Sequence, residues 1–97
     1  MTKADLVEQV AEAIGPGITK KDCALVVDGF LNAVKAALGR GDNIEIRGFG
    51  TFKVRSRKAR MARNPRTGDS VEVPSRTIPV FKPSKHLRAK VASLKTD

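Results

Sequence analysis

The 97-residue sequence contains one cysteine, Cys23, one histidine, His86, and neither tyrosine nor tryptophan. A lone cysteine cannot form an intramolecular disulfide, and one Cys with one His gives too few ligands for a zinc site. The convergent acids, bases and nucleophiles of an active site are also missing, as is a glycine motif that would cradle phosphates. We therefore expect a protein of a reducing cytosol that is not an enzyme and needs no metal or cofactor.

Long apolar runs are absent as well. No segment approaches the ~18 consecutive apolar residues of a membrane span, and no apolar core of a signal peptide follows Lys3 and Asp5. The sequence therefore predicts a soluble intracellular protein. A chain this short buries little surface alone, so oligomerisation is its expected source of stability.

Acidic residues are scarce in the second half of the chain. Residues 1–47 hold six Lys or Arg and seven Asp or Glu, whereas residues 48–97 hold thirteen and three, and the whole chain has a net charge of +9. Such an excess indicates a polyanionic partner such as nucleic acid. Its concentration in one half separates a neutral scaffold from a basic working half.

A first helix is expected after Thr2, which has the spacing of a capping box with Asp5. Apolar residues recur at helical spacing up to Ile14, and Gly15 ends the segment.

A second helix is expected from Thr19, which repeats the start signal with Asp22, to Gly39. The two helices should form an antiparallel hairpin. The second has few of the Arg, Asn and Gln side chains of a recognition helix, which argues against a helix-turn-helix. Ser84 can cap a short last helix, and residues 95–97 are expected to fray.

Between these helices the apolar period changes to two. Segments 44–47 and 52–55 alternate as strands do, and Gly48-Phe49-Gly50 between them predicts a bend or bulge that turns Phe49 inward. The return segment 71–81 alternates too, but it contains Pro74 and Pro79. Proline fits a strand only where no partner needs its N–H, so we expect an edge or a free two-stranded ribbon.

The ribbon is strongly basic, with seven Lys or Arg and no acid in residues 53–66. A few charges would suffice to protect an exposed edge strand, whereas the excess of Arg over Lys favours phosphate contacts and a narrow minor groove. At the tip, the turn residues of Arg63-Asn64-Pro65-Arg66-Thr67-Gly68 explain the segment locally. The rigid ring of Pro65 would also suit a wedge between base pairs.

These segments together resemble the HU/IHF family of bacterial histone-like DNA-binding proteins, and HU more than IHF. The likeness covers nearly the whole chain and rests on Lys3-Ala4-Asp5-Leu6, Gly48-Phe49-Gly50-Thr51-Phe52, Arg57, Arg60, Ala62, the tip segment and Phe81-Lys82-Pro83. Ala62 stands where many relatives have Gly, and the turn at 15–18 is longer than in many HU proteins. The tail beyond Val91 exceeds that of a short HU and leaves room for an IHF-type identity.

The resemblance implies an α+β fold: an intertwined dimer with an N-terminal helical hairpin, a three-stranded antiparallel sheet extended into a β-ribbon arm, and a short C-terminal helix. The chain would be a single domain over 1–97, with a helical dimerisation region at 1–40 and the arm within 53–81. We expect every aromatic residue to enter a core that only the dimer completes, namely Phe30, Phe49, Phe52 and Phe81. Pro65 would be the intercalating wedge. The expected DNA-binding residues are Lys3, Lys53, Arg55, Arg57, Lys58, Arg60, Arg63, Asn64, Pro65, Arg66, Arg76, Lys82 and Lys85.

The predicted function is to bind duplex DNA through its minor groove with low sequence specificity, and to bend and condense it in the bacterial nucleoid. Bent, nicked or flexible DNA should be preferred. An IHF-like, site-specific bending factor is the nearest alternative, followed by a structural RNA-binding protein and a dimeric adaptor for acidic proteins. All four phenylalanines lie outside the arm, so it lacks a base-stacking platform, which argues against RNA. The sequence leaves open a homodimer or a heterodimer with a paralogue.

Overall fold

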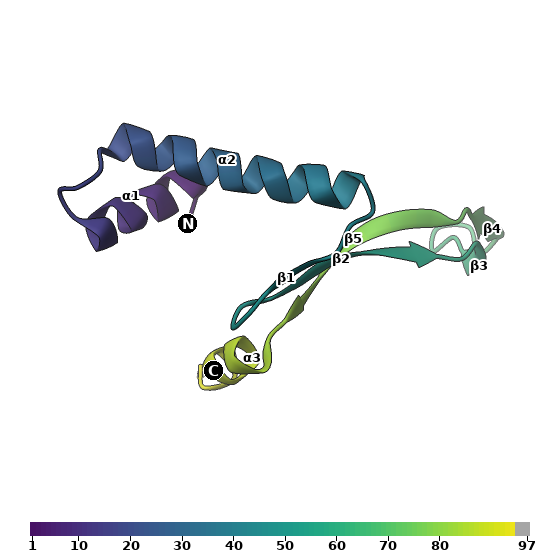
Figure 1. Ribbon diagram of the computed structural model, residues 1–97. Helices are drawn as coiled ribbons and strands as arrows, with labels where there is room; N and C mark the ends of the chain where they lie inside the picture. Colours follow the sequence, from purple (N-terminus) through teal and green to yellow (C-terminus); the bar gives the residue numbers. More distant parts are fainter. Residues whose placement is uncertain (95–97) are drawn as a thin grey trace. The chain divides into compact units, whose positions relative to one another are not determined.

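The computed structural model describes residues 1–94, so the expected fraying of 95–97 lies outside the described residues (Figure 1). The chain divides into two compact units, Met1–Ala36 and Ala37–Asp97. The elements of the described part are α1 (Lys3–Ile14), α2 (Lys20–Gly39), β1 (Ile44–Ile46), β2 (Gly50–Arg57), β3 (Arg60–Arg63), β4 (Ser70–Val73), β5 (Arg76–Pro83) and α3 (Lys85–Ala92).

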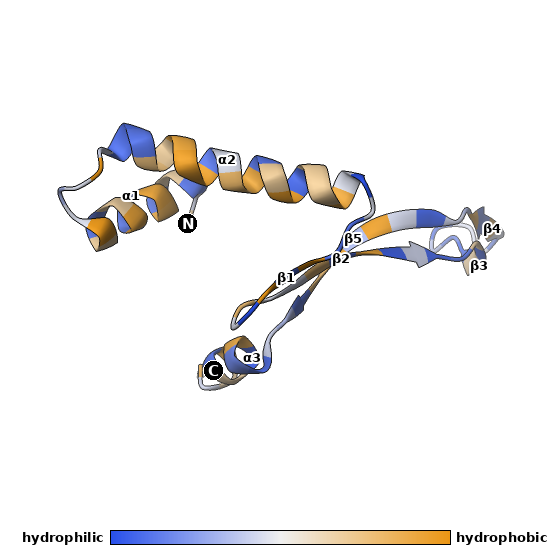
Figure 2. Cartoon of the chain, viewed as in Figure 1, coloured by the Kyte–Doolittle hydropathy of each residue, from blue (hydrophilic) through white to orange (hydrophobic). Residues whose placement is uncertain are grey.

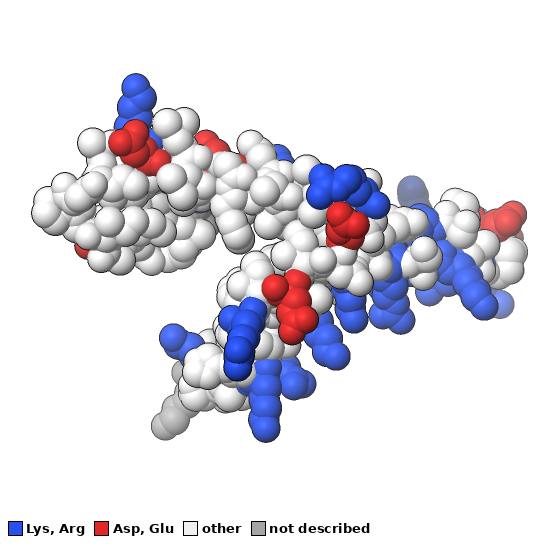
Figure 3. Space-filling model, viewed as in Figure 1, with Lys and Arg blue, Asp and Glu red and all other residues white. Residues whose placement is uncertain are grey.

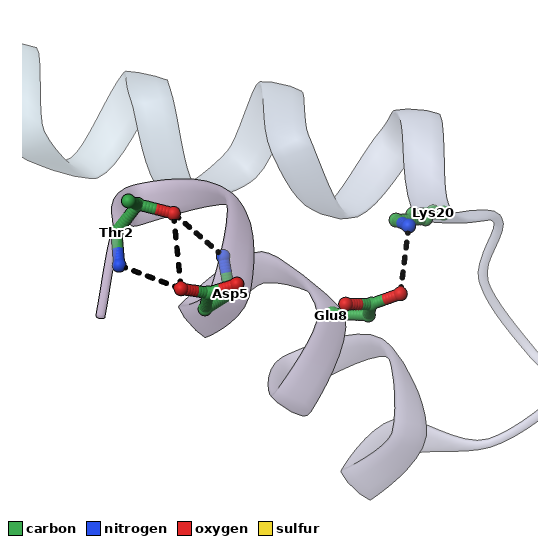
Figure 4. A network of polar contacts seen from close by, with 4 residues as sticks. All are labelled: Thr2, Asp5, Glu8 and Lys20. Atoms are coloured by element: carbon green, nitrogen blue, oxygen red, sulfur yellow. Dashed lines mark hydrogen bonds and ion pairs between the residues drawn. The ribbon is translucent and has the colours of Figure 1, made fainter.

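Helix α1 starts at the predicted capping box (Figure 4). The Thr2 N–H donates to Asp5 Oδ2 (2.8 Å), and the Asp5 N–H donates to Thr2 Oγ1 (3.3 Å). The helix ends at Gly15, whose φ of 86° lies in the left-handed region that favours glycine and whose N–H donates to the Ala11 carbonyl. Both predicted ends of this helix are confirmed.

Helices α1 and α2 run antiparallel, as two ion pairs between them show. Lys3 Nζ lies 2.7 Å from Asp28 Oδ1, and Glu8 Oε1, later in α1, lies 3.0 Å from Lys20 Nζ at the start of α2 (Figure 4). Each pair is exposed and therefore contributes at most about 1 kcal/mol. The predicted helical hairpin is confirmed, and these ion pairs add little to its stability.

The helical hairpin buries little of its apolar surface. Val7 is 4% exposed and Cys23 is fully buried. Figure 2 shows apolar residues repeating along both helices. Many of these side chains are exposed to solvent. The exposed set in these helices is Leu6, Val10, Ile14, Leu25, Val26, Phe30 and Leu31. The hairpin therefore presents an apolar stripe that its own residues do not cover.

The second unit is built on an antiparallel sheet of order β1-β2-β5. The bend expected at Gly48-Phe49-Gly50 is the hairpin turn between β1 and β2, in which the Phe49 N–H donates to the Ile46 carbonyl (3.0 Å). Gly48 has a φ of 83° there, which explains the glycine. The Phe49 ring lies 5.2 Å from the ring of Phe81, centroid to centroid, yet Phe49 is 45% exposed.

The two faces of the sheet differ in chemistry. Directly opposite residues share a face, and successive residues alternate between faces. One face is mostly apolar, and there the Phe52 and Phe81 rings lie 4.8 Å apart. Its apolar members include Ile44, Ile46, Phe52, Val54, Pro79 and Phe81. The opposite face carries the basic residues described below.

Helix α3 is tied to the β1–β2 turn by Ser84. The Ser84 hydroxyl accepts a hydrogen bond from the Leu87 N–H (3.0 Å), as the predicted cap requires, and donates one to the Gly48 carbonyl (3.0 Å). The Ser84 N–H also donates to the Phe49 carbonyl (2.9 Å). The start of α3 is therefore fixed against the end of the sheet. Within residues 1–94, no helix has the length and apolar character needed to cross a membrane.

Candidate nucleic-acid interface

A face rich in basic residues covers β2 and β5, and Ile78 and Val80 lie among its cations. Side chains on this face come from alternate residues of β2 and from their partners on β5, and Figure 3 shows Lys and Arg side chains projecting in a row along the sheet and the arm. None of the ion pairs found in residues 1–94 involves them. These cations are therefore free to contact an anion, and they are Lys53, Arg55, Arg57, Arg76 and Lys82.

The hydrogen-bond phase of the β2–β5 ladder follows from its prolines. Opposite residues in an antiparallel ladder alternate between pairs that exchange two backbone hydrogen bonds and pairs that exchange none. Gly50 lies opposite Pro83, which has no N–H, and bonding resumes where Ser84 donates to the Phe49 carbonyl. The pair Gly50–Pro83 is therefore not hydrogen-bonded, nor is any other pair with an even-numbered β2 residue.

The position of Val54 agrees with this phase. Its N–H donates to Asn43 Oδ1 (3.4 Å) on the β1 side of β2, so it points away from β5. Pro79, which lies opposite Val54, therefore costs the ladder no bond. The last hydrogen-bonded pair of this sheet is Arg57–Arg76.

The ladder changes phase between this sheet and the arm tip, where β3 and β4 pair. The Asn64 N–H donates to the Asp69 carbonyl (2.7 Å), so the adjacent pair Arg63–Ser70 is not hydrogen-bonded and Arg60–Val73 is. The last hydrogen-bonded pair of the sheet, Arg57–Arg76, and the next one, Arg60–Val73, are therefore three residues apart on each strand, whereas a regular ladder has a spacing of two. We call the residues between these two pairs the interruption. Each strand has one additional residue there, and the register of opposite residues is unchanged.

Pro74 explains this change of phase. In the unchanged register Pro74 lies opposite Ala59, and the phase of the β2–β5 sheet would require an N–H from it. With the hydrogen-bonding pattern of the β3–β4 ladder, the position of Pro74 requires no N–H donor. The structure agrees with the expectation that Pro74 lies where no partner needs its N–H, and it adds that the ribbon is divided there into two ladders.

The phase change also determines which face Arg60 joins. In a two-stranded antiparallel ribbon, all hydrogen-bonded pairs present their side chains on one face. Arg57 and Arg60 both belong to such pairs, so both lie on the basic face, although three positions separate them. An uninterrupted ladder would have put Arg60 on the apolar face. Arg63 lies on the other face of the tip, and Lys58 lies in the interruption.

The tip is a turn held by its own polar groups. Asn64 Oδ1 accepts a hydrogen bond from the Arg66 N–H (2.8 Å), and the Asn64 carbonyl accepts one from the Gly68 N–H (2.7 Å). Gly68 has a φ of 78°. Asn64 therefore forms the turn, while Pro65 and Arg66 are exposed at its end. The turn function of Asn64-Pro65 is confirmed, and the wedge function of Pro65 stays a prediction.

A second basic site lies in a cleft of about 320 Å³ between the β1–β2 turn and the start of α3. Two residues of the predicted set line it, Lys82 and Lys85, and the fold adds Arg47 and Arg88, which were not predicted from the sequence. Glu45 also lines the cleft, so its lining holds four cations and one carboxylate. The N-terminus of α3 adds partial positive charge there. In the sequence, Arg47 belongs to the alternating pattern of a strand and Arg88 to the periodic pattern of a helix, and neither pattern indicates that the two residues are close. Their proximity follows from the hydrogen bonds of Ser84 to the β1–β2 turn.

The remaining predicted residues are divided between the two units, with Lys3 and Phe30 in the first. Lys3 is paired with Asp28, and Phe30 is 54% exposed on α2. Phe49, Phe52 and Phe81 cluster in the second unit. The shared core of all four phenylalanines therefore stays a prediction. The described residues gather no group of three His, Cys, Asp or Glu side chains of the kind that holds a metal ion.

The family model described as bacterial DNA-binding protein matches residues 1–92. The chain belongs to this family. Its relatives include the DNA-binding protein HU of Thermus thermophilus, 47% identical over 91 residues that cover 94% of this chain and 92% of the relative. Integration host factor subunit beta of Methylococcus capsulatus is 43% identical over 95 residues, 98% of this chain and 99% of the relative.

Solved structures of the family share the fold. An Anabaena HU–DNA cocrystal structure matches with a TM-score of 0.83 and 39% identity, covering 97% of this chain and 100% of that one. HU from Thermotoga maritima matches with a TM-score of 0.66 and 32% identity, covering 94% and 98%. The predicted HU/IHF membership and α+β fold are confirmed. The chain is a histone-like DNA-binding protein, a class distinct from enzymes.

Proposed function

We propose that two copies of this chain grip duplex DNA in its minor groove with a pair of β arms and bend it with low sequence specificity. The basic face that runs from β2 and β5 onto Arg60 supports this proposal best. It presents unpaired Arg and Lys side chains along an exposed ribbon, and Pro65 lies exposed at the end. A narrow minor groove concentrates negative potential and attracts such side chains.

The apolar surface supports a dimer. The helical hairpin leaves its stripe exposed, and in the second unit Phe81, Leu87 and Val91 line an apolar hollow of about 460 Å³ beside α3. Apolar surfaces of this kind mark an interface in a soluble protein. A second copy of the chain is the proposed occupant, and pairing with a paralogue would use the same surfaces.

Bending requires that DNA contacts outweigh deformation. Bending a site smoothly costs on the order of 1–6 kcal/mol, and phosphate neutralisation with release of counterions offsets that cost. Insertion of Pro65 between base pairs would concentrate the bend at one step. Predeformed DNA lowers the cost, so nicked and four-way DNA should bind more tightly than a linear duplex. The chain would act in the cytoplasm, on the nucleoid.

One set of measurements tests this function. Fluorescence anisotropy with linear, nicked and four-way DNA gives the affinities, energy transfer between dyes at the DNA ends gives the bend, and native mass spectrometry gives the stoichiometry. We expect a dimer, a preference for nicked and four-way DNA, and a shorter end-to-end distance on binding. Binding of a monomer, or an unchanged end-to-end distance, would contradict the proposal.

A site-specific architectural function is the second candidate, because a relative of similar identity is an integration host factor subunit. Competition between a specific duplex, selected from a random pool, and bulk duplex separates the two. Specific factors prefer their site by typically ~10³-fold or more. A ratio near unity supports the low-specificity function, and preferential binding of RNA would contradict both.

A further inference from the structure

Met61 is an apolar side chain that the arm leaves open to solvent. It belongs to β3, lies directly opposite Glu72 of β4 and is 64% exposed. The ladder at the tip consists of two strands only, so Met61 has a strand neighbour on one side alone. An exposed fraction this large leaves the thioether within reach of small solutes.

The residues that share a face with Met61 are all polar. Directly opposite residues of a ribbon share a face, and so do alternate residues along one strand. Met61 therefore shares its face of the β3–β4 ladder with Arg63, Ser70 and Glu72. Arg63 lies two positions further along the same strand, about 7 Å away at the backbone, a distance that two long side chains can bridge. None of the ion pairs found in residues 1–94 involves Arg63 or Glu72, so Arg63 is available to a new acceptor.

We propose that Met61 is a redox-sensitive modification site, which a two-electron oxidant such as hydrogen peroxide converts to methionine sulfoxide while the arm is free of DNA. The sulfur lone pair attacks one peroxide oxygen, the O–O bond breaks, an S–O bond forms, and the other oxygen leaves with both hydrogens as water. The sulfur loses two electrons and the peroxide gains two, so the reaction needs no other reactant. A thiol-dependent sulfoxide reductase reverses the modification.

Oxidation changes the hydrogen bonding that Met61 can take part in. A thioether is a weak hydrogen-bond acceptor, whereas a sulfoxide is polar and its oxygen accepts readily. The Glu72 carboxylate opposite repels this oxygen and Arg63 can donate to it, so the sulfoxide should turn toward Arg63. Arg63 is then less available to DNA phosphates, and the new polar group must give up its water on entering a groove. We therefore expect the oxidised arm to bind duplex DNA more weakly, an expectation that rests on the proposed function.

Bound DNA should in turn shield Met61. In the proposed complex the tip lies in the minor groove, so only protein that is free of DNA exposes the thioether. With free duplex at about ten times its Kd, about one binding site in eleven is unoccupied, and oxidation of Met61 should slow about tenfold. Oxidation would thus act on the free protein and lower its DNA affinity until the sulfoxide is reduced.

Peptide mass spectrometry after timed exposure to hydrogen peroxide tests the site and its shielding. The full-length protein is treated with and without saturating linear duplex, and N-acetylmethionine amide in the same tube serves as a fully exposed reference thioether. We expect Met61 of the free protein to oxidise within about threefold of the reference rate, and the duplex to slow Met61 but not the reference. Oxidation of free Met61 more than about tenfold slower than the reference would overturn the site. Equal Met61 rates with and without bound duplex would overturn the shielding.

Two variants separate Met61 from the other sulfur groups of the chain, Met1 and Cys23. Met61→Leu keeps an apolar side chain of similar volume that peroxide does not oxidise. Peroxide treatment should raise the Kd of the wild type for duplex about threefold to tenfold, as expected for one lost hydrogen bond, and leave that of Met61→Leu unchanged. Met61→Gln places a carbonyl acceptor at the same position and should bind as weakly as the oxidised wild type. A sulfoxide reductase should restore the affinity of the oxidised wild type.

The binding measurements also separate failure of this proposal from failure of the proposed function. Equal loss of affinity in the wild type and in Met61→Leu would assign the effect to another residue and overturn the proposal, as would an unchanged affinity of the oxidised wild type. Either result, with tight duplex binding by the untreated protein, leaves the proposed function standing. Absence of duplex binding by the untreated protein contradicts the proposed function, while the oxidation rate of Met61 in the free protein still tests the site.

Discussion

Gly50 is the position at which a single methyl group should do most damage to the base of the arm. It is the first residue of β2, it is buried, and it lies opposite Pro83. A Cβ at Gly50 would lie 2.6 Å from the Lys82 carbonyl oxygen and 2.6 Å from two atoms of the Phe81 ring. The φ of Gly50 is not in the left-handed region, so Gly50→Ala introduces a clash and no backbone strain.

Neither neighbour can retreat freely. The Lys82 carbonyl belongs to the backbone of β5, and the Phe81 ring packs against the rings of Phe52 and Phe49, with centroids 4.8 and 5.2 Å away. Overpacking of this kind typically costs about 1–3 kcal/mol, and the backbone contact puts Gly50→Ala at about 3 kcal/mol. At about 4–8 °C per kcal/mol for a domain of this size, the Tm should fall by about 12–24 °C.

Thermal unfolding followed by circular dichroism measures the change, at one protein concentration because the Tm of a dimer depends on concentration. Gly17→Ala is the control, since Gly17 is exposed and a Cβ there meets nothing within 4 Å. It should leave the Tm unchanged or slightly raised. A Tm for Gly50→Ala within about 4 °C of the wild type, less than 1 kcal/mol, would refute the packing argument.

Three further changes test the arm and the helix cap. Pro65→Ala should keep much of the DNA affinity and reduce the bend, since it removes the wedge and leaves the charges; an unchanged energy-transfer distance would exclude the wedge. Arg60→Ala and Arg63→Ala should each weaken binding and reduce the slope of log K against log[salt] by about 0.9 for every phosphate that the variant no longer neutralises, measured by titration at several salt concentrations. Thr2→Ala should lower the free energy of unfolding by about 0.5–2 kcal/mol through loss of the capping box, measured by urea denaturation, and no change would mean that the cap contributes nothing.

Local signals made much of the fold predictable. Thr2 with Asp5 and Ser84 before α3 act within four residues of chain, so the hydrogen bonds they form follow from spacing alone. The strands of the sheet were predictable for the same reason, because alternation reports a buried and an exposed face. The basic arm was predicted from composition, and the chain was assigned to this family from its motifs.

The features that escaped prediction depend on pairing between distant segments. To predict the effect of Pro74, one would need to know that its partner is Ala59 and which pairs are hydrogen-bonded on each side of it. Composition reveals neither. Arg47 and Arg88 line the same cleft only because Ser84 fixes α3 to the β1–β2 turn. Such contacts are set by the tertiary structure, and a single sequence carries no direct signal for them.

The extra residue on each strand at Pro74 restricts how the arm can change in length. Deleting Ala59 alone would leave one strand a residue short, so every opposite pair beyond it would slip and Arg60 would lose its partner Val73. Deleting Ala59 together with Pro74 would instead restore a regular ladder through to the tip. Loss or gain of arm residues in matched pairs, one from each strand, therefore keeps the register of opposite residues, whereas a change in one strand alone requires a β-bulge or a shift of register.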